Sequence, residues 1–177
     1  SNTIIGVFSA CDMTSGKNNT AVGLNSARSM TTGERNTAIG QGAGLLIGAG
    51  SCNTIVGERA GLNSSGSFNT IVGSSTVGCA MTTGSCNTIL GGFNGNQFNV
   101  DIRTSCKNVV LADGVGVPAI RSTSNREFRT VDRDYGNAFI NQVVRCAGNV
   151  SETFAFGDDM RLPDNSGAFI MITVGGT

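Results

Sequence analysis

The chain has 177 residues, including 26 glycines, and contains neither histidine nor tryptophan. Its 12 basic residues are scattered and balanced by 12 acidic ones, so no basic stripe could neutralise a row of phosphates, and nucleic acid is not an expected partner. The 39% apolar content with zero net charge excludes a disordered tail, and the many glycines predict a thin coil rich in tight turns.

A short motif recurs along the first two thirds of the chain. The pattern Asn-Thr-apolar-apolar-Gly appears six times, with successive starts 17, 17, 17, 16 and 18 residues apart. A degenerate seventh copy starts 21 residues later, after the loop FNGNQFNVDIRTS. A glycine lies three residues before each of the second to sixth copies. Because this second marker keeps a constant spacing to the motif, a chance repeat is excluded. The copies begin at Asn2, Asn19, Asn36, Asn53, Asn69, Asn87 and Asn108.

Each period predicts one coil of a parallel β-solenoid. A period has room for two short strands and two turns, because the Asn-Thr core favours β-structure and glycine bounds it on both sides. A helical repeat is excluded because the apolar residues come in adjacent pairs and glycine interrupts every few positions. We therefore expect an all-β fold, with an elongated parallel β-solenoid or β-prism stem over residues 1–117.

The adjacent aliphatic pair of each motif predicts association between copies of the chain. Neighbouring side chains of a strand point to opposite faces, so one member fills the coil and the other needs a second apolar surface. In a slender solenoid, another copy of the same chain supplies that surface. The residues expected to pack in the core or between copies are Ile4, Ile5, Ala21, Val22, Ala38, Ile39, Ile55, Val56, Ile71, Val72, Ile89, Leu90, Val109 and Val110.

The repeated polar residues are expected to be structural. Asparagine tolerates left-handed turns and stacks into amide ladders, and threonine fits strands. The six cysteines form no CxxC pair, and without histidine they match no zinc pattern. Cys52 and Cys86 occupy equivalent positions two coils apart, roughly 9.6 Å at about 4.8 Å per strand, which exceeds disulfide reach. We expect buried or half-buried, reduced thiols.

The motifs resemble those of a known class. The segments TTGERNTAIGQGAG and TTGSCNTILGGF are similar to the NTAIG/NTAVG repeats with TTG spacers found in phage tail-fibre shafts and in bacterial surface proteins, and to the head repeats of trimeric autotransporter adhesins. The resemblance covers residues 2–117. It implies a homotrimeric stem whose apolar strand residues face the coil interior and the threefold axis. NVVLADGVGVPAIR, residues 108–121, resembles the stretch that closes such fibre repeats.

Beyond Pro118 the periodicity stops and charged residues become denser. Residues 118–136, with alternating charge signs, are expected to form a connector. Strands are expected at residues 137–144, 150–156 and 168–174, which would begin a small β domain over 137–177 with further strands beyond it. No apolar run approaches the roughly 18 residues that span a bilayer, so membrane insertion is not expected.

The chemistry of the chain argues against an enzyme. Without histidine, neither a Ser-His-Asp nor a Cys-His nucleophile can form, and no GxSxG elbow occurs. A glycan depolymerase using two carboxylates would draw on Asp158, Asp159 or Asp164, which are interpreted as turn acids. No calcium-loop spacing is present, and the GVG of LADGVGVP is a very weak phosphate-loop signal. No catalytic residue, cofactor or metal is expected.

Together these observations predict a structural and adhesive segment of a bacteriophage tail fibre. It would assemble as a homotrimer in the host cytoplasm, join other tail or fibre proteins in the virion, and project a tip toward a host cell-surface glycan or protein. The alternative is the head of a trimeric adhesin on a bacterial cell surface, and the second alternative is the depolymerase. Unpaired thiols favour the phage fibre, because an exported adhesin passes through an oxidising compartment.

Overall fold

The computed structural model describes residues 1–73, 75–122 and 128–130, and every structural statement below concerns these residues. All of them belong to the first of the two units into which the chain divides, Ser1–Val143. The strands expected within residues 137–177 lie outside the described residues, as do the acidic residues of the depolymerase alternative and Cys146.

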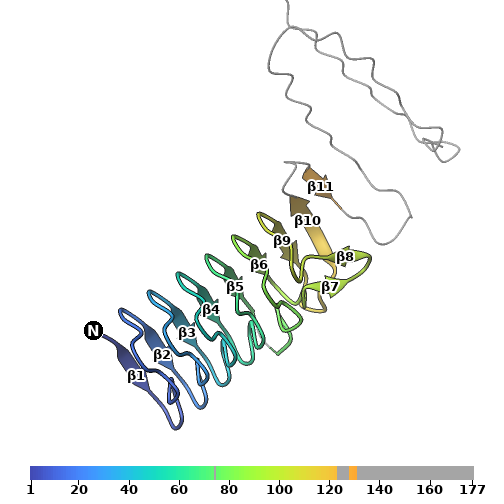
Figure 1. Cartoon of the computed structure of the whole chain (residues 1–177). Helices are drawn as coiled ribbons and strands as arrows, with labels where there is room; N and C mark the ends of the chain where they lie inside the picture. The colour runs from blue at the N-terminus through green and yellow to red at the C-terminus, as the bar shows by residue number, and fades with distance from the viewer. Residues whose placement is uncertain (74, 123–127, 131–177) are drawn as a thin grey trace, which may run out of the picture. The chain divides into compact units, whose positions relative to one another are not determined.

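Seven short strands stack in parallel, one for each copy of the motif (Figure 1). The register is strict, since Thr20 lies opposite Thr37 and Thr70 lies opposite Thr88. The predicted parallel β-solenoid is thus confirmed, with about six turns between the first and last parallel strands. These strands are β1 Thr3–Ile5, β2 Thr20–Val22, β3 Thr37–Ile39, β4 Thr54–Val56, β5 Thr70–Val72, β6 Thr88–Leu90 and β9 Val109–Ala112.

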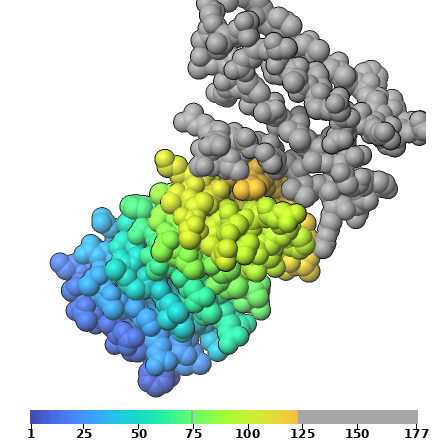
Figure 2. All heavy atoms as spheres, turned by 45° about the vertical axis from the view of Figure 1, so that its right-hand side comes forward, coloured from blue at the N-terminus to red at the C-terminus, as the bar shows by residue number. Residues whose placement is uncertain are grey.

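Each regular coil contains one strand, so the expectation of two strands per period is wrong. The other part of the coil is made of turns that repeatedly enter the left-handed region, as at Asn25 (φ 56°) and Ala27 (φ 47°). Such residues interrupt an extended strand. Hydrogen bonds between coils nevertheless continue through these turns, for example from Ala27 N to Ala43 O at 2.8 Å. The turns therefore stack as regularly as the strands (Figure 1). In the space-filling view the successive coils form consecutive bands of colour (Figure 2).

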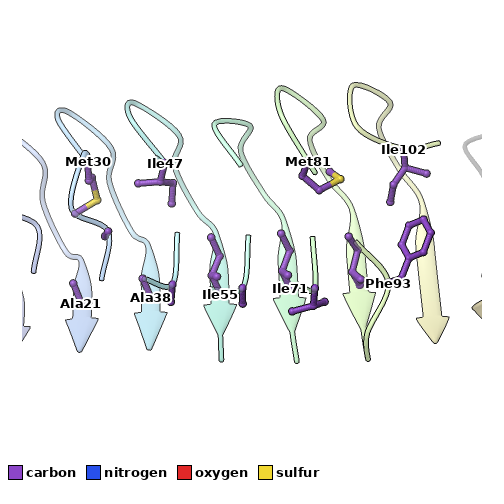
Figure 3. Close-up of a cluster of buried hydrophobic side chains, with 14 of the residues drawn as sticks. Ala21, Met30, Ala38, Ile47, Ile55, Ile71, Met81, Phe93 and Ile102 are labelled. Atoms are coloured by element: carbon purple, nitrogen blue, oxygen red, sulfur yellow. The ribbon is translucent and has the colours of Figure 1, made fainter. Parts of the chain in front are cut away.

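The coil interior is apolar. The sizes of its strand and turn residues vary from coil to coil so that large residues lie against small ones. Strand residues such as Ile55 and Ile71 face the inside, opposite apolar side chains from the far side of the coil, including Met30, Ile47, Met81 and Ile102 (Figure 3). A Cβ on Gly61 would lie 3.1 Å from Ile71 Cδ1 and 3.2 Å from Ile55 Cδ1. In the coil of Asn19, Ala27 occupies the equivalent turn position and the inward strand residue is Ala21. The turn residue matches the inward residue of the next coil: glycine lies against a large one, as Gly61 does against Ile71, whereas alanine precedes a small one, as Ala27 precedes Ala38.

The motif asparagines form a buried ladder, as the structural interpretation predicts. Asn36 is 2% exposed; its backbone N donates to Asn19 Oδ1 at 2.9 Å and its Nδ2 donates to Gly50 O at 2.8 Å. Each buried amide thus links its own turn to the preceding coil. A second ladder was not predicted: the backbone N of Ser51 donates to Ser67 Oγ, and that of Ser67 to Ser85 Oγ, both at 3.0 Å.

The parallel stack ends where the chain reverses after β9. Strand β10, Pro118–Ser122, pairs antiparallel with β9 and with β11, Phe128–Thr130. The range predicted as a connector, 118–136, therefore begins with strands of the same sheet. The loop FNGNQFNVDIRTS contains a separate antiparallel pair, β7 Asn96–Gln97 and β8 Val100–Asp101. Within the described residues, no helix is long and apolar enough to cross a membrane.

Candidate interaction surface

The second aliphatic residue of each motif lies on the outside of the sheet. Because the strands are in register, these residues line up from one coil to the next. Ile5 is 60% exposed, Ile39 40% and Leu90 39%, and the other members are half-buried. We call this set the apolar row. It comprises Ile5, Val22, Ile39, Val56, Val72, Leu90 and Leu111.

A row of threonines runs beside the apolar row on the same face. In each three-residue strand the first and third side chains point outward and the middle one inward. The motif threonine is the first residue of β1 to β6, and none of these strands contains a charged residue. From β1 to β6 the outer face of the sheet is therefore uncharged and regular. Contiguous exposed apolar surface of this kind is characteristic of protein–protein interfaces.

The two members of each aliphatic pair lie on opposite faces of the strand, and the first and seventh copies differ in detail from the others. Ile4 occupies an inward position but is 41% exposed, because it lies in the first strand of the sheet. In the seventh copy, Val109 lies opposite Thr88 and Leu111 lies opposite Leu90. Val109 of the predicted pair therefore points outward at the threonine position and is 40% exposed, and Leu111 is the residue that continues the apolar row. The inward members, all buried, are Ala21, Ala38, Ile55, Ile71, Ile89 and Val110.

The five described cysteines are free. Their burial differs from the prediction, since Cys11, Cys86 and Cys106 are exposed. Cys52 and Cys79 are half-buried, and burial raises the pKa of the Cys79 thiol. Cys52 and Cys86 occupy equivalent left-handed turn positions (φ 59° and 58°), each just before a buried asparagine.

No cluster of three metal-ligating side chains occurs in residues 1–73 and 75–122. The GVG segment lies in the turn between β9 and β10, and no helix follows it within the described part of the chain. Asp113 Oδ1 shapes that turn by accepting hydrogen bonds from the backbone N of Val115 at 3.0 Å and of Val117 at 2.8 Å.

The chain matches no protein-family model, no curated protein and no solved structure. Fold and surface alone therefore define its class. It is a parallel β-solenoid repeat protein, built from in-register coils with a buried asparagine ladder and an uncovered apolar row. This architecture is compatible with a repeat fibre-like protein.

Proposed function

We propose that the chain is a structural and adhesive segment of a bacteriophage tail fibre, in which three copies associate through the apolar row. The three rows would face a common axis, and the solenoid stem would hold a host-binding part of the fibre at a distance. Other tail or fibre proteins and a host cell-surface glycan or protein are the proposed partners.

The apolar row is the observation that supports this proposal. Val56 and its equivalents lie on the uncharged outer face of β1 to β6, and one aliphatic side chain recurs at each coil, about 4.8 Å apart. A slender coil has a high surface-to-volume ratio, so its own core buries little apolar area for each ordered residue. Association across the apolar row adds burial along the whole stem, which is the requirement for a stiff fibre.

The free thiols favour a phage fibre over an exported adhesin. Three of the five described cysteines are exposed, and exposed thiols pair wrongly during passage through an oxidising compartment. A particle assembled in a reducing cytoplasm avoids this hazard. Thiol titration of protein from its natural source should find these cysteines reduced, and oxidised cysteines would favour the adhesin.

Mass measurement tests the association directly. Light scattering after gel filtration should give three times the chain mass of 18.1 kDa for the wild-type protein. Val56→Asp places a charge in the middle of the apolar row and should abolish the trimer. Thr83→Asp introduces the same charge at an exposed turn outside the sheet and should leave the trimer intact. A folded, monodisperse wild-type monomer would refute the proposal.

A further inference from the structure

One core position on the far side of the coil is polar in the coil that begins at Asn53. At this position the backbone N donates to the carbonyl O three residues earlier, as Met30 N does to Ala27 O at 2.9 Å. Ser64 N donates to Gly61 O in the same way at 3.0 Å. Ser64 is therefore the equivalent of the large apolar residues of the other coils. In the coils that begin at Asn2, Asn19, Asn36 and Asn69, these residues are Met13, Met30, Ile47 and Met81.

The hydroxyl group of Ser64 is buried without a hydrogen-bond partner. Two other serines are buried in the described stem, and both use their hydroxyl groups to bond to the next coil. Ser9 Oγ donates to Ala21 O at 3.1 Å, and Ser26 Oγ donates to Ala38 O at 2.7 Å. A buried hydroxyl group that has lost its bonds to water and gained none in the protein is destabilising. The core is therefore weakened in the coil of Ser64.

The backbone bonds from this coil to the next one are also reduced. In the preceding coil, the residue before the core position donates its backbone N to the next coil, as Leu46 N does to Leu62 O at 2.9 Å. Among the described residues, the backbone N of the equivalent Asn63 makes no such bond. Its exposed side chain bonds instead, from Nδ2 to Cys79 O at 2.9 Å. This bond contributes less, because fixing the side chain costs rotamer freedom and water competes for both groups.

The asparagine ladder loses a bond at the same place. Asn36 and Asn53 each donate from Nδ2 to Oδ1 of the preceding asparagine, at 3.2 and 3.1 Å. Asn69 keeps the bond from its backbone N to Asn53 Oδ1, but its Nδ2 donates only to Gly84 O, and Asn87 repeats this arrangement. We call the contact between the coils that begin at Asn53 and Asn69 the Asn53–Asn69 step. Core, turn and ladder are all weakened at this step.

The longest coil of the stem does not show this weakening of its core. The coil that begins at Asn87 contains a hairpin, formed by β7 and β8, which extends to one side of the stack (Figure 1). This coil keeps the large apolar Ile102 buried in the core. The coil that begins at Asn53 is the shortest, with 16 residues to the next asparagine, and has Ser64 in the core instead.

We propose that the Asn53–Asn69 step is a built-in opening point of the stem, where two coils separate locally before the steps on either side open. Local opening occurs where few buried apolar contacts and few hydrogen bonds hold a layer. Each coil of a solenoid contacts only its neighbours, so one step can open while the rest of the stack stays folded. The stem would bend at this height. The bonds concerned lie within one chain, so the opening goes beyond the proposed fibre and does not depend on association between copies.

Hydrogen exchange of backbone amides, followed by NMR on the full chain, tests this opening. Thr37, Thr54 and Thr88 each donate their backbone N to the motif asparagine O of the next coil at 2.8 Å. The three amides therefore differ mainly in the step that they cross, and only Thr54 crosses the Asn53–Asn69 step. The protection factor of Thr54 should be about tenfold lower than those of the other two, because its step opens without unfolding of the whole stem. Equal protection of the three amides would overturn the proposal.

Ser64→Ala and Ser26→Ala form a matched pair of variants with opposite expected effects. Both remove a fully buried hydroxyl group, but only that of Ser26 has a partner. Ser64→Ala should raise the protection factor of Thr54 about tenfold, because it removes a buried polar group that makes no bond. Ser26→Ala should lower the protection of the amides in its own coil and leave Thr54 unchanged. An unchanged or lower protection of Thr54 in Ser64→Ala would overturn the proposal, since the buried hydroxyl group would then not be what weakens the step.

Discussion

The coils that begin at Asn36 and Asn87 share one motif but behave as different kinds of structure. In the regular coil, the buried asparagine and many backbone groups bond to the coil above or below. In the longer coil, the same framework is kept, but the hairpin lies beside the stack and its polar groups bond within the hairpin. Repetition therefore restricts the residues inside the stack, while an inserted loop is free to vary.

The largest expected difference between these two regions is the loss of stability when an asparagine is replaced. Asn53→Ala removes the acceptor of Asn69 N and the donor to Gly66 O, which leaves both groups buried without a partner. We expect the free energy of unfolding to fall by about 3 kcal/mol, at about 1–3 kcal/mol for each orphaned group. Urea unfolding monitored by circular dichroism measures this loss. Asn96→Ala in the hairpin is the control and should change stability by less than about 0.5 kcal/mol.

Replacing glycine should give a second, smaller difference in stability between a regular coil and the turn after β9. Gly61→Ala places a side chain in the left-handed region (φ 54°) and against two isoleucines at 3.1–3.2 Å. We expect a loss of about 2–4 kcal/mol from strain and overpacking together. Gly114→Ala, in the turn after β9, meets no atom within 4 Å and should be nearly neutral. Equal losses from both substitutions would contradict the close packing of the regular coils.

The smallest effect concerns pH and is confined to the hairpin. The hydrogen bonds from Arg103 lower the pKa of Asp101 from 3.8 to about 2. A carboxyl group whose pKa is lower in the folded state stabilises that state above its unfolded pKa, and the contribution is lost as the pH falls from about 4 toward 2. Carbon-detected NMR should follow this titration. Arg103→Ala should return the pKa of Asp101 toward its ordinary value, with no change in the stem resonances.

Much of the stem could be predicted from sequence because its motif is periodic. The phase of the asparagines fixed the coil boundaries, and the adjacent aliphatic pairs implied one inward and one outward row. The second strand was predicted wrongly because left-handed φ angles at non-glycine residues such as Ala27 and Arg35 leave no signal in composition. Leu111 was missed because the seventh copy replaces threonine with Val109, which moved the apparent pair by one position.

The hairpin and the end of the stack were harder to predict. The turn Phe98-Asn99 lacks the glycine that usually marks a two-residue hairpin, so the loop gave no clear strand signal. Strand β10 begins with Pro118, which suits an edge or a strand start but was interpreted as the beginning of a connector. Both features depend on contacts with neighbouring coils that a single pass along the sequence does not contain.

The hydrogen bonds between coils determine how the stem responds to force. Because these bonds run from one coil to the next, tension along the stack loads successive layers in series, and the layer with the fewest bonds opens first. Each opened coil releases about 17 residues, or roughly 55 Å of extended chain. A stretched stem would therefore lengthen stepwise, as coils unfold one at a time, and would absorb work before it breaks.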